Sequence, residues 1–163
     1  MHAVFVYLGC DMINIRIVAV GNLKEKFSKD AEKEYQKRLS AFSKIEIVET
    51  KEFNELKNVD LIKEKEGEEI LRHISGFPIL LDRLGDEVSS EDFAKIIQKI
   101  SLQSSSVTFI VGGSYGVSGA VKKVAKKAIS FSKLTFPHNL FRVMLLEQIY
   151  RAFTIIQGKK YHK

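Results

Sequence analysis

Short apolar runs alternate along this chain with longer segments in which apolar residues recur about once per helical turn. The runs at residues 13–20, 78–82 and 107–111 have the length and continuity of buried strands. The segments at 59–75 and 140–157 have the helical repeat. Because strands that alternate with helices favour a mostly parallel sheet with helices on both faces, the sequence predicts an α/β fold.

Weaker patterns complete this layout. They predict helices at about residues 27–42, 89–103 and 119–130, strands at 44–49 and 131–136, and loops at 50–58 and 83–89. Ser89, followed three residues later by Asp92, is a capping pattern that marks a helix start. The apolar stripes of the predicted helices include Leu61 in one, and Val121 and Val124 in another.

The composition is that of one globular domain. The chain has 163 residues, of which 45% are hydrophobic and 28% charged, and it has no linker or repeat. A single cysteine, Cys10, excludes an internal disulfide, and no apolar run reaches the roughly 18 residues of a membrane span. These features predict one cytoplasmic domain over residues 1–163. Residues 1–11 precede Met12 and the first strand, so we expect them to be a non-native or upstream-start extension.

Positive charge is concentrated in the C-terminal third of the chain. Residues 112–163 contain ten Lys or Arg and one acid, whereas the first 111 residues contain sixteen basic and nineteen acidic side chains. The lysines at 122, 123, 126 and 127 would form two like-charge pairs on one helix, which a phosphate backbone would offset. This distribution favours a polyanionic partner, although a solvated basic surface would have the same composition.

A glycine loop is the strongest local signal for a ligand. Gly112 and Gly113 follow an apolar strand and precede a helix, where a backbone without Cβ atoms can approach a cofactor and adopt positive φ. A tight strand-to-helix turn would also require glycine. The motifs G-x-G-x-x-G, G-x-x-x-x-G-K-[ST] and G-x-S-x-G are absent, and the four histidines share no metal-ligand spacing with one another or with the cysteine. No metal site is therefore expected.

The last predicted helix is apolar in almost every direction. Between Leu140 and Ile156 its only charged residues are Arg142, Glu147 and Arg151. A helix that is apolar all round must be buried on all sides, which in so small a protein indicates packing against a second copy. We therefore predict a homodimer, in which Glu147 and Arg151 can form an ion pair.

The tail Tyr161-His162-Lys163 combines an aromatic ring, a titratable ring and a cation. These groups suit stacking on a base and contact with phosphate. Chain ends are also often disordered, so the tail alone does not indicate a function.

Six motifs resemble those of a known family. They are Ile17-Val18-Ala19-Val20-Gly21, Glu64-Lys65-Glu66-Gly67, Val111-Gly112-Gly113-Ser114-Tyr115-Gly116, the stretch from Phe131 to His138, Glu147-Gln148-Ile149-Tyr150-Arg151-Ala152, and Tyr161-His162-Lys163. Their order and spacing from Met12 to the end are similar to the ribosomal RNA large subunit methyltransferase H family, which belongs to the SPOUT methyltransferases.

The resemblance implies a deep trefoil knot near the C-terminus and a homodimer in which the tail of one copy completes the site of the other. It implies methyl transfer from S-adenosylmethionine to N3 of a pseudouridine in 23S rRNA, within the ribosome. Two alternatives stay open. One is a knotted methyltransferase with a different RNA target, such as a ribose 2′-hydroxyl, and the other is a non-catalytic ribosome-binding or RNA-binding factor of the same fold.

The resemblance also implies site residues. The implied cofactor contacts are Leu81, Gly112, Gly113, Phe131, Ser132, Lys133, Leu134, Thr135 and Phe136. The residues implied around the reacting centre or the RNA are His138, Arg142, Glu147, Arg151, Tyr161 and His162. We expect the adenine in an apolar slot between Leu81, Phe131 and Leu134. His138, His162 or nearby positive charge could assist loss of the N3 proton.

Overall fold

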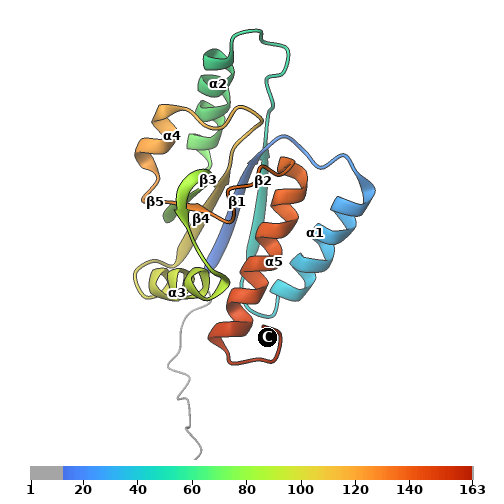
Figure 1. The fold of residues 1–163 in the computed structure, drawn as a ribbon, viewed down its shortest axis with the longest axis vertical. Helices are drawn as coiled ribbons and strands as arrows, with labels where there is room; N and C mark the ends of the chain where they lie inside the picture. Colours follow the sequence, from blue (N-terminus) through green and yellow to red (C-terminus); the bar gives the residue numbers. More distant parts are fainter. Residues whose placement is uncertain (1–12, 163) are drawn as a thin grey trace, which may run out of the picture.

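Five parallel strands form one sheet in the order β2-β1-β4-β3-β5 (Figure 1). The strands are β1 (Asn14–Val20), β2 (Ile45–Thr50), β3 (Phe77–Glu87), β4 (Ser106–Val111) and β5 (Lys127–Ser130). The computed structural model describes residues 13–162, so the predicted extension at 1–11 lies outside the described residues. The parallel sheet confirms the predicted α/β class.

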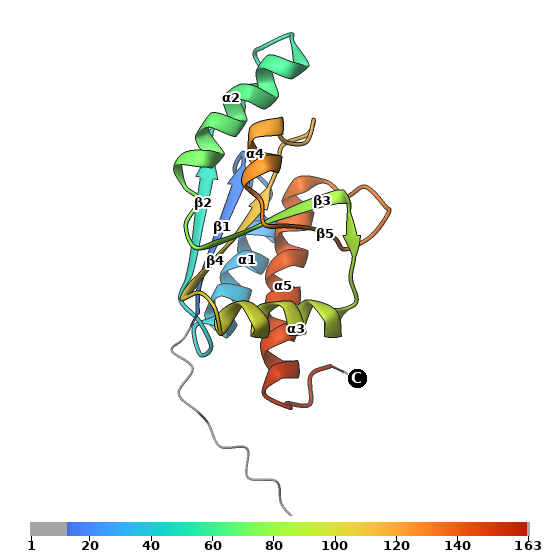
Figure 2. The same cartoon turned by 90° about the vertical axis from the view of Figure 1, so that its left-hand side faces the viewer.

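Helices cover both faces of the sheet, as predicted (Figure 2). One face carries α1 (Lys26–Leu39), α3 (Ser90–Ser101) and α5 (His138–Ile156), and the other carries α2 (Val59–Arg72) and α4 (Gly119–Val124). Successive residues of a strand point to opposite faces. Ile15 and Ile17 of β1 therefore join the first core, whereas Val18 and Val20 join the second.

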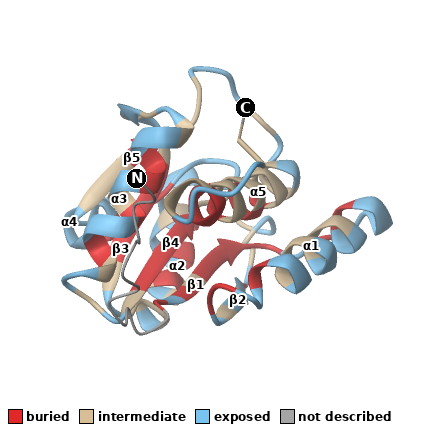
Figure 3. Cartoon of the chain, turned by 90° about the horizontal axis from the view of Figure 1, so that it is seen from below, coloured by how far each residue is buried: buried red, intermediate tan, exposed pale blue. Residues whose placement is uncertain are grey.

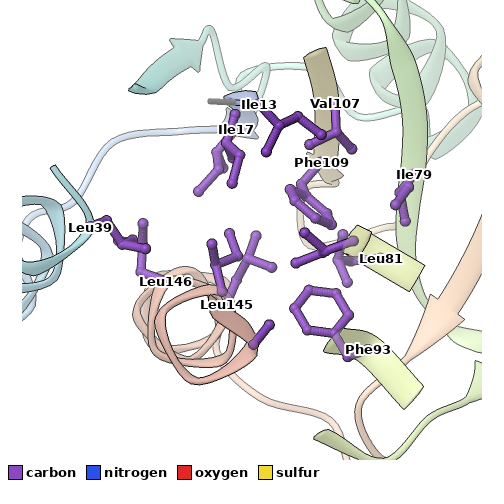
Figure 4. Packing of buried hydrophobic residues seen from close by; sticks show 14 of the residues in the cluster. Ile13, Ile17, Leu39, Ile79, Leu81, Phe93, Val107, Phe109, Leu145 and Leu146 are labelled. Atoms are coloured by element: carbon purple, nitrogen blue, oxygen red, sulfur yellow. The ribbon is translucent and has the colours of Figure 1, made fainter. Parts of the chain in front are cut away.

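The larger core lies between the sheet and helices α1, α3 and α5 (Figure 4). The Phe93 and Phe109 rings, from α3 and β4, lie 5.7 Å apart between centroids. Buried residues are concentrated on β1, β3 and β4 and on the side of α5 that faces them (Figure 3). Removal of this apolar surface from water, worth about 25 cal/mol per Å², fixes α5 across the sheet.

The strand register brings three chain segments to one edge of the sheet. Ala19 of β1 pairs with Val111 of β4, and Val111 pairs with Leu81 of β3. Gly112 and Asp82 therefore emerge side by side at the carboxyl ends of these strands. Open parallel sheets bind their ligands at this edge.

The predicted helix at 119–130 is wrong in its second half. Helix α4 ends at Val124, which is exposed instead of inward, and Ala125 has an extended ψ of 123°. The next residues form β5, and the Lys126 N–H donates a 3.0 Å hydrogen bond to the Pro78 carbonyl. The stability that residues 127–130 gain by pairing with β3 outweighs their weak helical repeat.

Because α4 ends at Val124 and β5 follows it, two further predictions are also wrong. The predicted strand at 131–136 is a loop between β5 and α5. Because Lys126 and Lys127 lie beyond the end of α4, the two like-charge pairs expected on one helix do not form. Lys126 instead stands over the Phe77 ring, with 5.2 Å from Nζ to the centroid.

The predicted loop at 83–89 is also wrong, because β3 continues to Glu87 through an irregularity between Leu81 and Asp86. Leu61 is exposed on α2, where the buried positions are Ile62, Glu66, Gly67 and Ile70. The helix predicted from Ser89 is confirmed, and the Asp92 N–H donates to Ser89 Oγ at 3.1 Å. The trefoil knot stays a prediction.

Candidate functional site

A cavity of about 760 Å³ opens at the carboxyl edge of the sheet. Residues from three stretches line most of it, at 80–84, 111–117 and 129–138. The lining includes every predicted cofactor residue except Lys133, namely Leu81, Gly112, Gly113, Phe131, Ser132, Leu134, Thr135 and Phe136. Cavities of this size hold cofactors and drug-sized ligands. The structure therefore brings the predicted cofactor residues together, and their contact with a cofactor stays a prediction.

The glycine loop leaves no room for side chains at two positions. A Cβ atom on Gly113 would lie 2.6 Å from Glu66 Oε2, and one on Gly112 would lie 2.7 Å from a methyl group of Val117. The positive φ of 82° belongs to Gly116, whose N–H donates to the Gly113 carbonyl at 3.0 Å. Glycine therefore serves the turn at Gly116 and close packing at Gly112 and Gly113.

The 131–137 loop supplies an apolar wall. The Phe131 ring packs edge-on against Phe93 at 5.3 Å and lies 5.4 Å from the Phe141 ring, so α3 and α5 hold it in place. Leu81 is buried, whereas Leu134 is 69% exposed. The three residues of the expected adenine slot thus line one cavity, with Leu134 at its rim.

Positive side chains outnumber acids in the cavity lining. Lys63 of α2, Arg83 of β3 and Lys122 of α4 line it together with one acid, Asp82. Lys122 Nζ lies 3.8 Å from Asp82 Oδ2, which offsets one of these charges. The lining can therefore attract an anionic group such as a phosphate.

His138 begins α5 at the cavity, and its ring lies near Gly21. A Cβ atom on Gly21 would lie 3.6 Å from His138 Nε2 and 3.5 Å from Glu52 Oε2, so both groups flank the same glycine. Gly21 has a φ of 79°, a conformation that favours glycine at this position. His138 therefore lines the cavity, and its part in the reaction stays a prediction.

Arg142 lies one turn further along α5 and is buried. Its Nε donates to Glu32 Oε2 and its Nη2 to Glu49 Oε1, both at 2.6 Å. Glu49 Oε1 also accepts a 3.3 Å hydrogen bond from the Leu23 N–H. Arg142 is absent from the cavity lining, and its hydrogen bonds tie it to α1 and β2.

The other four predicted residues form a cluster towards the C-terminal end of α5, which we call the tail cluster: Glu147, Arg151, Tyr161 and His162. Arg151 Nη2 and the Tyr161 hydroxyl donate to Glu147 Oε1, at 2.6 Å and 3.2 Å. The two nitrogens of the His162 ring lie 3.3 Å from Arg151 Nη1 and 2.8 Å from Glu91 Oε1. Tyr161 and His162 are therefore packed on α5.

The environment of the tail cluster shifts three pKa values, and the hydrogen bond with Glu147 raises the pKa of Arg151. Burial, followed by hydrogen bonds with Tyr35 and Glu147, raises the pKa of Tyr161 to about 12. The Tyr161 hydroxyl is therefore protonated and a donor at neutral pH. The hydrogen bond with His162 lowers the pKa of Glu91, which keeps that carboxylate charged.

The tail cluster and the cavity are well separated in one chain. Arg151 lies thirteen positions after His138 on α5, which at 1.5 Å per residue is about 20 Å. The structure therefore divides the predicted reacting centre into His138 at the cavity, Arg142 in a buried ion network, and the tail cluster.

One buried residue near the cavity received no role from the sequence. Glu66 is 3% exposed, and its Oε2 lies against the glycine loop at Gly113. Its place on α2, four residues from both Ile62 and Ile70, puts it on the buried face of that helix. The available signals were that spacing and the place of Glu66 in the motif Glu64-Lys65-Glu66-Gly67, but a charged residue in a charged helix is usually exposed.

Residues 13–162 contain no cluster of three or more His, Cys, Asp or Glu side chains that could hold a metal ion. Among the helices in this range, none is long and apolar enough to cross a membrane.

Comparison with known proteins identifies close relatives. Residues 13–162 match the model of a family described as predicted SPOUT methyltransferase. Three similar proteins are named ribosomal RNA large subunit methyltransferase H. The one from Caldicellulosiruptor saccharolyticus is 48% identical over 91% of this chain and 99% of its own length. Those from Clostridium botulinum (strain Kyoto) and Clostridium kluyveri (strain NBRC 12016) are 49% and 46% identical, each over 93% of this chain and 100% of their own length.

Proposed function

Because this chain belongs to the SPOUT methyltransferase family, we propose that it transfers a methyl group from S-adenosylmethionine to N3 of a pseudouridine in 23S ribosomal RNA. One observation carries the proposal. The end of β3, the glycine loop and the 131–138 stretch, far apart in the sequence, converge on one cavity at the carboxyl edge of the sheet, with His138 in its lining.

The cavity has the chemistry that S-adenosylmethionine requires. Leu81 and Phe131 offer apolar surface to the purine, and the backbone of Gly112 and Gly113 lines the same cavity. When bound, the cofactor supplies a methyl group already activated on a sulfonium. The work left to the protein is to orient the target base and to accept its proton.

We assign proton acceptance to His138. The N3 proton must leave as the new N–C bond forms, so an acceptor has to lie near the cavity. The His162 ring has both nitrogens engaged, by Arg151 and Glu91, whereas the His138 ring makes no hydrogen bond within residues 13–162. Glu52, beside the same glycine as His138, would stabilise the imidazolium that forms.

A homodimer completes this proposal. Leu140, Val143 and Met144 remain partly exposed on α5, and with Glu147 and Arg151 they form a stripe at helical spacing. A second copy packed on this stripe would bury it. Because the tail cluster lies about 20 Å along the helix from His138, the tail of one copy would serve the cavity of the other.

The remaining partner is RNA in the cytoplasm. Lys63, Arg83 and Lys122 place positive charge around the cavity, where the backbone of the target loop would approach. This local charge, together with the basic C-terminal third of the chain, fits the ribosomal RNA named in the relatives.

Two measurements test the proposal. Calorimetric titration of the purified protein with S-adenosylmethionine is expected to show saturable binding, and light scattering is expected to give the mass of a dimer. Ribosomes that lack the modification should then gain N3-methylpseudouridine, detected by mass spectrometry of digested 23S rRNA. A methyl group on a ribose hydroxyl would point to another target, and cofactor binding without any RNA product would point to a non-catalytic factor.

A further inference from the structure

Glu66 is a buried carboxyl group with one unsatisfied oxygen. The residue is 3% exposed, on the face of α2 that packs toward the sheet. Its Oε1 accepts a 3.3 Å hydrogen bond from the Phe53 N–H. Its Oε2 is buried and has no hydrogen-bond partner among residues 13–162. An unpaired buried polar oxygen costs about 1–3 kcal/mol of stability, and more if it is charged. A carboxyl group that carries this cost is therefore a candidate for a functional role.

The unsatisfied oxygen lies directly behind the wall of the cavity. It is 2.6 Å from the position of a Cβ atom on Gly113, and Gly113 lines the cavity. No side chain can stand at that position, so only the glycine backbone separates Glu66 Oε2 from a group bound against the loop. Charges on the two sides of this backbone would interact more strongly than they do across bulk water.

On balance, the surroundings of this carboxyl group favour its neutral form. Burial raises the pKa of Glu66, the hydrogen bond from Phe53 opposes that rise, and the nearby Glu52 adds to it. A cation bound at Gly113 would supply the missing counter-charge and favour the ionised form.

We propose that Glu66 is a specificity-determining residue that favours a sulfonium cofactor over its neutral thioether product through the bare backbone at Gly113. The inference rests on the proposed function, since it takes S-adenosylmethionine as the ligand of this cavity. Methyl transfer converts the positively charged sulfonium into uncharged S-adenosylhomocysteine. The carboxylate therefore loses its counter-charge when the reaction is complete, which weakens retention of the product.

A second consequence concerns protons. If a cation at Gly113 drives ionisation of Glu66, then binding of S-adenosylmethionine releases protons to the buffer. Binding of S-adenosylhomocysteine releases fewer, because the charge that favours ionisation is missing.

The test is the ratio of two affinities. Calorimetry on the full chain gives the dissociation constants of S-adenosylmethionine and S-adenosylhomocysteine for the wild type, for Glu66→Gln and for the control Glu64→Gln. The glutamine at 66 keeps an oxygen for the Phe53 N–H, and Glu64 is an exposed glutamate on the same helix. Glu66→Gln is expected to weaken binding of S-adenosylmethionine roughly tenfold and binding of S-adenosylhomocysteine less than twofold. Glu64→Gln is expected to change neither affinity.

Each outcome decides a separate question. If Glu66→Gln weakens the binding of both ligands equally, Glu66 only holds Phe53 and Gly113 in position, and the inference is overturned. If the variant does not fold, proton release by the wild type decides, measured in two buffers of different ionisation enthalpy. Equal release with both ligands overturns the inference, and larger release with the sulfonium supports it. A wild type that binds neither ligand overturns the proposed function, and the inference with it.

Discussion

The Nη2 atom of Arg142 lies 2.6 Å from Oε1 of Glu49, which joins the first half of α5 to the end of β2. The Arg142 side chain is 4% exposed and also pairs with Glu32 of α1. Three elements therefore meet at one guanidinium, close to the carboxyl edge of the sheet. The position of α5, and so of His138 at its first turn, depends on this network.

We expect Arg142→Ala to destabilise the protein. Removal of the guanidinium leaves two carboxylates without their cation, one of them largely buried, and breaking such a buried pair costs about 3 kcal/mol. Urea denaturation followed by circular dichroism measures the change in the free energy of unfolding. The control is Arg72→Ala, which removes the pair between the exposed Arg72 side chain and Glu69 and should leave stability nearly unchanged. Equal stability of the two variants would show that the network does not hold α5.

Arg151→Ala should affect methylation far more than stability. The side chains of the Arg151–Glu147 pair are 25% and 19% exposed, so the loss of the pair, and of the contact with the Tyr161 ring, costs about 1–2 kcal/mol. If the tail cluster serves the reaction, methylation of ribosomes should fall more than a hundredfold at a temperature where the variant stays folded. A fall no larger than the fraction unfolded would make the pair purely structural.

Gly113→Ala should weaken cofactor binding through Glu66. The added Cβ atom would lie 2.6 Å from Glu66 Oε2 and 3.1 Å from a methyl group of Val20, so the loop must shift. We expect at least a tenfold loss of S-adenosylmethionine affinity by calorimetry. The matched control is Gly119→Ala, because no atom lies within 4 Å of a Cβ there. Unchanged affinity in Gly113→Ala would place the cofactor elsewhere.

The sequence predicts the sheet and the position of the cavity well, for a physical reason. Apolar runs such as 78–82 and 107–111 are buried whatever surrounds them, and parallel strands bring their carboxyl ends to one edge. The glycines that follow Val111 therefore lie at the edge where the cavity opens.

The errors lie where tertiary pairing outweighs local pattern. Residues 127–130 have alanine and lysine in a helix-like repeat, but the sheet edge at β3 makes them a strand. Polar residues 83–87 read as a loop, yet they extend β3 past an irregularity. Glu66 reads as a solvated charge, because burial of a carboxyl group depends on neighbours distant in the sequence.

Glu66 also predicts how stability depends on pH. Burial raises its pKa in the folded state, so its contribution to stability is fully present below the unfolded pKa and is lost as the pH rises through the folded value. The Glu66→Gln variant does not lose stability in this way, because glutamine does not ionise. Its free energy of unfolding, relative to wild type, should therefore rise from about pH 4 upward and level off above the folded pKa, with a slope of at most about 1.4 kcal/mol per pH unit. Glu64→Gln should show no such trend in parallel denaturation series.

Deletion of residues 159–163 should abolish activity while sparing the fold and the dimer. The deletion removes Tyr161, which contacts Glu147, Arg151 and Tyr150, but it leaves the partly exposed stripe on α5. Light scattering and thermal denaturation check the dimer and the fold. Residual activity of the deleted form close to wild type would show that the tail plays no part in the reaction.

A mixing experiment then shows which cavity the tail serves. The deleted chain has an intact cavity and no tail, and full-length Gly113→Val has an intact tail and a blocked cavity, so each alone should be inactive. If the tail acts across the dimer, random pairing gives mixed dimers with one complete site, and activity returns to about a quarter of wild type. If the tail served its own chain, no mixed dimer would contain a complete site, and the mixture would stay inactive. Because about 20 Å of α5 separates the tail cluster from His138 within one chain, we expect activity to return.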